Sequence, residues 1–158
     1  ALPISLVKNK MHGTHVLTHD EDVEECKKKL EGYELVYGIR DAKGLEFKSV
    51  MVLDFFSSLP NDLQKPWSDL LLGRGDRHDF KVKYPEVEGQ LKLLYTAITR
   101  CIDRLLFAET SSSKAGDAFS RFMTERKNGE TQSIATLNKT GDIENMAMTQ
   151  DEVRSIFL

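Results

Sequence analysis

Two short segments of the sequence could carry chemistry. The first, Asp41–Phe47, reads DAKGLEF and leads into the continuous apolar run Val50–Leu53. The second, Leu93–Arg100, reads LLYTAITR. The lysine and glutamate of the first segment and the final arginine of the second are the charged side chains that could act on a ligand.

Each segment taken alone also has a purely structural explanation. Lys43-Gly44 could form a hairpin turn between two strands, since glycine adopts positive φ readily. Arg100 could pair with Asp103, or it could bind the last carbonyl groups of its own helix.

A helix is expected to position the second segment, from Gln90 to about Cys101. Its core-facing side has apolar residues at the helical spacing i, i+3, i+4 and i+7, namely Leu91, Leu94, Tyr95 and Ile98. Arg100 lies nine positions after the first of these, nearly half a turn round the helix. We therefore expect Arg100 to point towards a partner domain.

The rest of the pattern alternates strands with helices. Strands are expected at Thr14–Thr18, Tyr33–Tyr37, Val50–Leu53 and Leu105–Ala108. A continuous apolar run such as the third suits a strand buried on both faces of a parallel sheet. The sequence therefore predicts an α/β fold with a largely parallel sheet.

Helices are expected between these strands. A capping box at Thr18–Glu21 predicts a helix start, and Val23, Cys26 and Leu30 then share one face. A further helix, marked by Phe119, Phe122 and Met123, ends near Gly129. Residues 57–89 are interrupted by proline and glycine, so we interpret them as a long, partly ordered insertion with a short apolar piece around Trp67–Leu72.

Composition limits the class of protein. The chain has 158 residues, a formal net charge of −3 and 40% hydrophobic residues. The apolar runs are too short to span a bilayer, so a transmembrane protein is excluded. The net charge is negative, whereas a domain that binds nucleic acid electrostatically is usually basic. The two cysteines form no CxxC motif, and no signal peptide is recognised at the start of the sequence. Both features indicate an intracellular protein, in the nucleus or the cytoplasm.

The domain organisation expected is one domain with a tail. We interpret residues 1–12 as a non-native or truncated segment, 13–127 as the folded domain, 128–148 as a linker and 149–158 as the start of a truncated helical region. His12, His15 and His19 with Cys26 could suggest a metal site. We expect none, because a strand and a helix start need not bring these side chains together.

Taken together, the two segments resemble motifs V and VI of the UvrD/Rep family of superfamily 1 helicases. KGLEF before a buried strand and LYxAxTR about fifty residues later match the family's T-x-H-x-x-K-G-L-E-F and R-L-x-Y-V-A-x-T-R-A. The chain is also similar to the helicase-like region of large eukaryotic TPR and ankyrin repeat-containing proteins, through Val50, Leu53, Phe55, Phe56 and Trp67, and through Met148–Glu152.

The resemblance implies a RecA-like, three-layer domain of the P-loop NTPase type, and a site shared with another domain. Arg100 would approach the γ-phosphate of ATP as an arginine finger, a role that suits the fork and permanent charge of a guanidinium. Lys43 would lie near the same phosphate. Glu46 would accept a hydrogen bond from the ribose hydroxyl, and Gly44 would let the loop backbone approach.

The sequence departs from the family pattern at several positions. The threonine and histidine of motif V, which contact single-stranded nucleic acid in the family, fall on Gly38 and Arg40. Arg40 could still bind a phosphate, but Gly38 offers no side chain. The alanine after the Thr-Arg pair is Cys101.

No Walker A motif is present, because none of the ten glycines is followed by Lys-Ser or Lys-Thr. A Walker B-like acidic pair after an apolar strand is absent too. The chain is thus expected to be inactive alone and to be the C-terminal half of an ATP-dependent DNA or RNA helicase. A missing first RecA-like domain of the same parent chain would hold ATP and Mg²⁺. The alternative is a degenerate, non-hydrolysing scaffold or interaction module.

Overall fold

A four-stranded, all-parallel sheet forms the centre of the domain. The computed structural model describes residues 13–126. The strand order is β2-β1-β3-β4. The strands are β1 (His15–Thr18), β2 (Val36–Gly38), β3 (Phe47–Leu53) and β4 (Cys101–Ala108). The predicted α/β class with a parallel sheet is confirmed.

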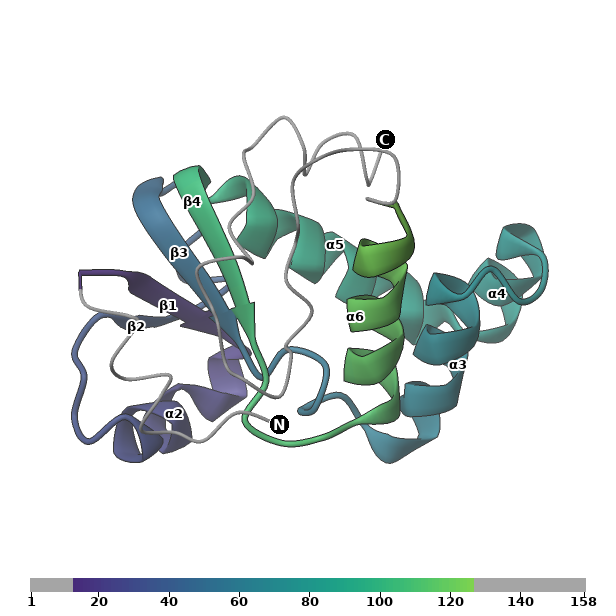
Figure 1. Cartoon of the computed structure of the whole chain (residues 1–158), viewed down its shortest axis with the longest axis horizontal. Helices are drawn as coiled ribbons and strands as arrows, with labels where there is room; N and C mark the ends of the chain where they lie inside the picture. Colours follow the sequence, from purple (N-terminus) through teal and green to yellow (C-terminus); the bar gives the residue numbers. More distant parts are fainter. Residues whose placement is uncertain (1–12, 127–158) are drawn as a thin grey trace.

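Helices cover this sheet in a three-layer arrangement. They are the 3₁₀ turn η1 (Asp20–Asp22) and the helices α2 (Val23–Lys29), α3 (Asn61–Leu71), α4 (Arg77–Lys83), α5 (Pro85–Thr99) and α6 (Lys114–Arg126). The chain steps outward from β1 to β2, then returns past β1 to β3 and β4. Because parallel crossovers are right-handed, these opposite steps place α2 on the face opposite α5. Figure 1 shows α3, α5 and α6 together, away from α2.

The apolar run Val50–Leu53 is buried as predicted. Each of its four side chains is at most 1% exposed. β3 lies between β1 and β4, so hydrogen bonds on both edges and helices on both faces enclose it. The first candidate segment leads directly into this strand, and the second leads into β4 beside it.

The prediction of a partly ordered insertion at 57–89 is wrong. This stretch forms α3, α4 and the start of α5. Pro60 is the N-cap of α3 and Pro85 lies in the first turn of α5, positions where a missing N–H removes no helical bond. Trp67 is fully buried against the rings of Phe55 and Phe56. Pro60 and Pro85 therefore begin helices that the sequence pattern interpreted as broken, while Pro66 is accommodated inside α3.

The start of α2 also differs from prediction. No side-chain cap bonds the first turn at His19 or at Asp22, so the capping box does not form. The carboxylate of Asp20 instead accepts the backbone N–H of Arg40, at 3.0 Å, across to the next strand connection. The predicted apolar face is confirmed, since Cys26 and Leu30 are buried.

Helix α5 is longer than predicted and turned relative to the expected face. Leu94 and Ile98 are buried, but Tyr95 is 39% exposed. Val87 and Ala97 are buried as well, so the buried stripe is centred to one side of the tyrosine.

The predicted linker and terminal helical region, 128–158, lie outside the described residues. Within 13–126, no helix is both long and apolar enough to cross a bilayer.

Candidate functional site at the amino edge of the sheet

The two candidate segments meet at the amino edge of the sheet. β3 begins at Phe47 and β4 begins at Cys101, and these residues are paired. The backbone N–H of Phe47 donates to the carbonyl oxygen of Arg100 at 2.8 Å. Glu46 and Arg100 therefore belong to directly adjacent stretches of backbone, although more than fifty positions separate them in the sequence.

Tight turns hold the first segment ahead of β3. Lys43 N–H donates to the carbonyl of Arg40 at 3.1 Å, and Leu45 N–H donates to that of Ala42 at 3.0 Å. Gly44 has φ of +86°, and a Cβ there would meet no atom within 4 Å. Glycine is thus required by the backbone conformation rather than by a lack of space.

The charged side chains of this segment face solvent. Lys43 and Glu46 are exposed, and neither forms an ion pair within residues 13–126. Leu45 between them is 47% exposed, which is unusual for a leucine beside a buried strand. These three side chains are available to a ligand or to another domain.

Arg100 is the C-cap of α5 and is half-buried. One terminal nitrogen donates to Thr99 Oγ1 at 3.3 Å, a long hydrogen bond. Its Nε is fully buried and has no hydrogen-bond partner in the described part of the chain. Since an unmet buried donor costs about 1–3 kcal/mol, this guanidinium is in a position that an added acceptor would stabilise.

Arg40 does not lie with Glu46 and Arg100 at the amino edge, and the hydrogen bond from Lys43 N–H to the carbonyl of Arg40 holds the backbone of Lys43 beside Arg40. It follows β2, whose last residue, Gly38, pairs with Thr18 at the carboxyl edge. Because β1 pairs with both strands, Gly38 lies level with the carboxyl end of β3 at Leu53, six residues after Phe47. At about 3.3 Å per residue, the two edges are about 20 Å apart along the strands.

Asp20 explains why position 38 is a glycine. A Cβ on Gly38 would overlap the carboxylate of Asp20 and lie 3.0 Å from its Cα. Any side chain at position 38 would therefore require the carboxylate of Asp20 to move. An acidic group at this point opposes the approach of a nucleic-acid phosphate.

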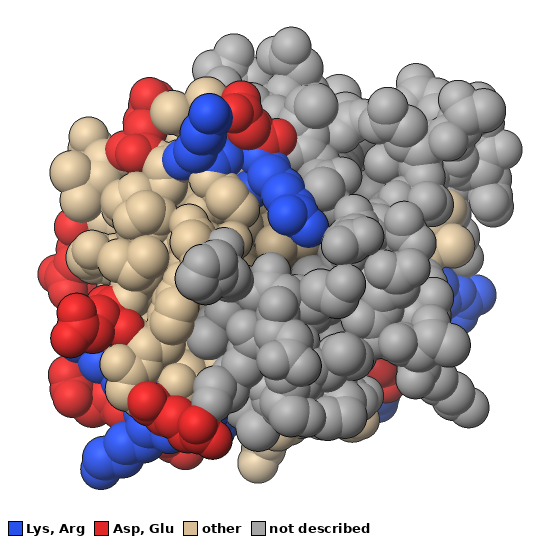
Figure 2. Space-filling model, turned by 60° about the vertical axis from the view of Figure 1, so that its left-hand side comes forward, with Lys and Arg blue, Asp and Glu red and all other residues tan. Residues whose placement is uncertain are grey.

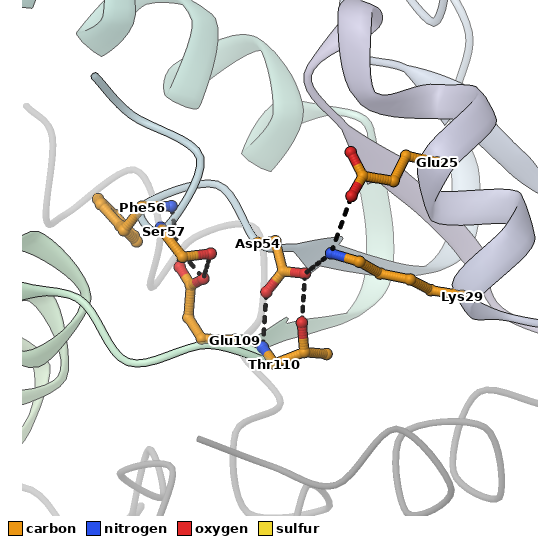
Figure 3. A network of polar contacts seen from close by, with 7 residues as sticks. All are labelled: Glu25, Lys29, Asp54, Phe56, Ser57, Glu109 and Thr110. Atoms are coloured by element: carbon orange, nitrogen blue, oxygen red, sulfur yellow. Dashed lines mark hydrogen bonds and ion pairs between the residues drawn. The ribbon is translucent and has the colours of Figure 1, made fainter. Parts of the chain in front are cut away.

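A second polar cluster lies at the carboxyl edge, and the sequence analysis missed it (Figure 3). Glu109, just after β4, is 7% exposed; it accepts hydrogen bonds from the backbone N–H of Phe56 at 2.9 Å and the hydroxyl of Ser57 at 2.8 Å. Burial raises the pKa of Glu109 to about 8, and the nearby charge of Asp54 adds to this, while the donors from Phe56 and Ser57 oppose it.

Asp54, just after β3, completes the cluster from the other side. Its carboxylate accepts the backbone N–H and the hydroxyl of Thr110, both at 2.6 Å, and lies 3.8 Å from Lys29 Nζ. Its φ is +53°, an uncommon value for a residue other than glycine. The signal that could have predicted this cluster is an acidic residue directly after each of two buried strands.

A small pocket lies beside this cluster, between α2 and the end of β3. Thr18, Cys26, Lys29, Asp54 and Ser58 are among its lining residues. This is the point where the connections from β1 and β3 depart in opposite directions, the usual ligand position in open parallel sheets.

The histidines that could have suggested a metal have other contacts. The ring of His15 stacks on Phe47, with centroids 4.1 Å apart, and His19 Nε2 hydrogen-bonds to the carbonyl of Phe55 at 2.8 Å. Within 13–126, no three histidine, cysteine or acidic side chains are grouped to hold a metal ion. His12 lies outside the described residues.

Charge on the described surface is mixed. Figure 2 shows Lys and Arg side chains next to Asp and Glu side chains around an uncharged area. No broad surface of positive charge is visible on the described part of this face, so it lacks the electrostatic footprint of a nucleic-acid groove.

Comparison of the chain with protein-family models, with curated proteins and with solved structures finds no match.

Proposed function

We propose that this domain is the C-terminal RecA-like half of a UvrD-like helicase, and that it completes an ATP site whose other half lies on a first RecA-like domain. The observation that carries the proposal is the meeting of the two motif segments at one edge, joined by the hydrogen bond from Phe47 to Arg100. A glutamate and an arginine are thereby brought to one edge, with the exposed Lys43 three residues before the glutamate.

The state of Arg100 supports its role as the arginine finger. Its guanidinium has no acidic partner within 13–126, and its buried Nε has no acceptor. ATP supplies a γ-phosphoryl group whose oxygens are acceptors of the kind that this fork of donors fits. Arg100 then stabilises the negative charge that develops in phosphoryl transfer, an effect of about 10³–10⁵ in rate for arginine fingers.

The exposed residues before β3 complete the chain's share of the site. Lys43 adds a second positive charge, and the carboxylate of Glu46 can accept a ribose hydroxyl. Gly44 sets the turn that places both. The metal ligands and the phosphate-binding loop belong to the first domain, because this chain has no Walker A motif.

The test is ATP turnover in a protein that joins this chain to the first RecA-like domain. Arg100→Ala is expected to lower kcat by at least about a hundredfold, with little loss of stability. Arg74→Ala is the matched control, because Arg74 is exposed beyond α3, and it should leave turnover unchanged. Equal turnover in the wild type and Arg100→Ala would remove the arginine-finger role.

A second candidate function follows from Gly38 and Asp20. The carboxylate beside Gly38 opposes phosphate at the edge where the family contacts single strands, which favours a scaffold that binds nucleotide without moving along nucleic acid. Arg40→Ala distinguishes the two: it weakens single-stranded DNA or RNA binding in a helicase and has no such effect in a scaffold.

A further inference from the structure

The guanidinium of Arg100 is held by a neutral hydroxyl. Within residues 13–126, its side chain makes one hydrogen bond, from a terminal nitrogen to Thr99 Oγ1 at 3.3 Å. Neither Glu46 nor Asp103 forms an ion pair with it in this part of the chain. The pairing with Asp103 that the sequence allowed therefore does not form, and the acceptor is the residue before the arginine.

The hydroxyl of Thr99 is itself fixed by the last turn of α5. Its oxygen donates to the carbonyl of Tyr95 at 2.9 Å and lies 3.1 Å from the carbonyl of Thr96. A hydroxyl has one hydrogen and two acceptor lone pairs. Because the helix carbonyls take the hydrogen, the hydroxyl meets Arg100 as an acceptor, at a position that the helix sets.

The strength of this contact suits a bond that has to be released. Hydrogen bonds from a guanidinium to a charged acceptor are about 2.7–2.9 Å long and roughly twice as strong as neutral ones. The bond to Thr99 is 3.3 Å long and its acceptor is uncharged. A phosphate oxygen is therefore the stronger acceptor, whereas a carboxylate at position 99 would compete with it.

We propose that Thr99 is the positioning residue for Arg100: its hydroxyl holds the guanidinium at the amino edge until a phosphate oxygen replaces it as acceptor. This inference rests on the proposed function, in which Arg100 acts on the γ-phosphate. An arginine side chain has several rotatable bonds, so holding it close to its acting position reduces the ordering that the reaction step must supply. Thr99 acts only through Arg100.

Thr96 provides a matched control on the same helix. Its hydroxyl donates to the carbonyl of Lys92 at 2.9 Å, the same bond to the residue four positions earlier that Thr99 makes to Tyr95. In the described part of the chain no hydrogen bond joins the Thr96 side chain to Arg100. Valine at either position keeps the branched shape and removes this helix bond, but only Thr99→Val removes the acceptor of Arg100.

The experiment measures kcat and KM for ATP in the protein that joins this chain to the first RecA-like domain. Thr99→Val is expected to lower kcat about three- to tenfold, the range of one hydrogen bond, with KM little changed. The loss falls on kcat because an arginine finger acts on charge that develops in the transition state. Thr99→Ser retains the hydroxyl and is expected to restore kcat, and Thr96→Val is expected to change neither constant.

A second readout needs no nucleotide and no partner domain. Nitrogen-15 relaxation of the Arg100 Nε–H in the 158-residue chain reports how firmly the guanidinium is held. We expect faster motion in Thr99→Val than in the wild type, and wild-type motion in Thr99→Ser and Thr96→Val. A change confined to Thr99→Val assigns the hold to the hydroxyl and not to the stability of the helix end.

The results separate this inference from the proposed function. A large loss of kcat in Arg100→Ala beside wild-type kcat in Thr99→Val would overturn the positioning role and leave the function in place. Wild-type kcat in Arg100→Ala would remove the function and the positioning role together.

The double variant and the relaxation data give two further ways to overturn the role of Thr99. Because Thr99 acts through Arg100, adding Thr99→Val to Arg100→Ala is expected to cause no further loss of kcat. An additional loss would show that Thr99 acts on another group. Unchanged Arg100 relaxation in Thr99→Val would show that the hydroxyl does not hold the guanidinium.

Discussion

Single residues at the amino edge show how the backbone positions the side chains of the proposed site. The backbone carbonyl of Arg100 accepts a hydrogen bond from Phe47 at the start of β3. The Nε–H of its side chain has no acceptor in the described part of the chain. Gly44 places Lys43 and Glu46 through its positive φ and not through close packing. The residue types were evident from the sequence, but the junction between them depends on strand pairing, which no local pattern contains.

Gly44 offers a direct test of this conformational role. Gly44→Ala is expected to destabilise the domain by about 1–2 kcal/mol, because alanine at positive φ is strained while its methyl group meets no neighbour. Gly89→Ala in α5 is the matched control and is expected to stabilise by about 1 kcal/mol. Urea unfolding measures both. Equal effects of the two substitutions would show that φ at Gly44 is not the constraint.

At the scale of helices and strands, short sequence patterns predicted the fold class. The helices of the stretch 57–89 and the pairing between distant residues could not be predicted in this way. The apolar run Val50–Leu53 predicted the central parallel strand. The Pro- and Gly-punctuated stretch 57–89 was misjudged, because Pro60 and Pro85 start helices in the structure. The acids after two buried strands, Asp54 and Glu109, could be noted from the sequence, but their partners lie more than fifty positions away and depend on how β3 and β4 align.

The buried side-chain amide of Gln64 joins α3 to the connection after β3 and to α6. Its side chain donates to the carbonyls of Phe56 and Leu59 and accepts the N–H of Ala115 in the first turn of α6. Gln64→Leu leaves these backbone groups buried without partners, and we expect a loss of about 2–3 kcal/mol in urea unfolding.

The neighbouring Lys65 is the control for that substitution. It pairs with Asp69 at 2.9 Å on the exposed side of α3. Lys65→Ala is expected to cost less than about 1 kcal/mol, as for other surface pairs. If Gln64→Leu costs no more than this, the amide does not join α3 to α6 as described.

For the whole molecule, the buried Glu109 makes stability depend on pH. Its pKa is about 8 in the folded chain and near 4.5 when unfolded, so between these values the folded chain keeps a proton that the unfolded chain releases. The free energy of unfolding is therefore expected to fall as pH rises through this range.

Glu109→Gln isolates this contribution. The difference in unfolding free energy between the wild type and the variant, followed from pH 5 to pH 9 by urea denaturation, should shift in favour of the variant as pH rises. A difference that stays constant with pH would mean that Glu109 titrates alike in both states.

The two edges of the sheet carry different groups. In the proposed site, Glu46 and Arg100 at the amino edge face the nucleotide, while the carboxyl edge carries the buried carboxylates of Asp54 and Glu109. Figure 1 shows these edges as opposite ends of β3 and β4. If the amino edge completes a nucleotide site, loss of the Arg100 side chain lowers the rate of hydrolysis, and loss of the Glu46 carboxylate weakens nucleotide binding.

The most direct measurement is therefore kcat and nucleotide Kd, determined side by side in the two-domain protein for Arg100→Ala and Glu46→Gln. The account predicts that Arg100→Ala lowers kcat by at least about a hundredfold with Kd little changed, and that Glu46→Gln mainly raises Kd. Unchanged kcat in Arg100→Ala together with unchanged Kd in Glu46→Gln would contradict the proposed site.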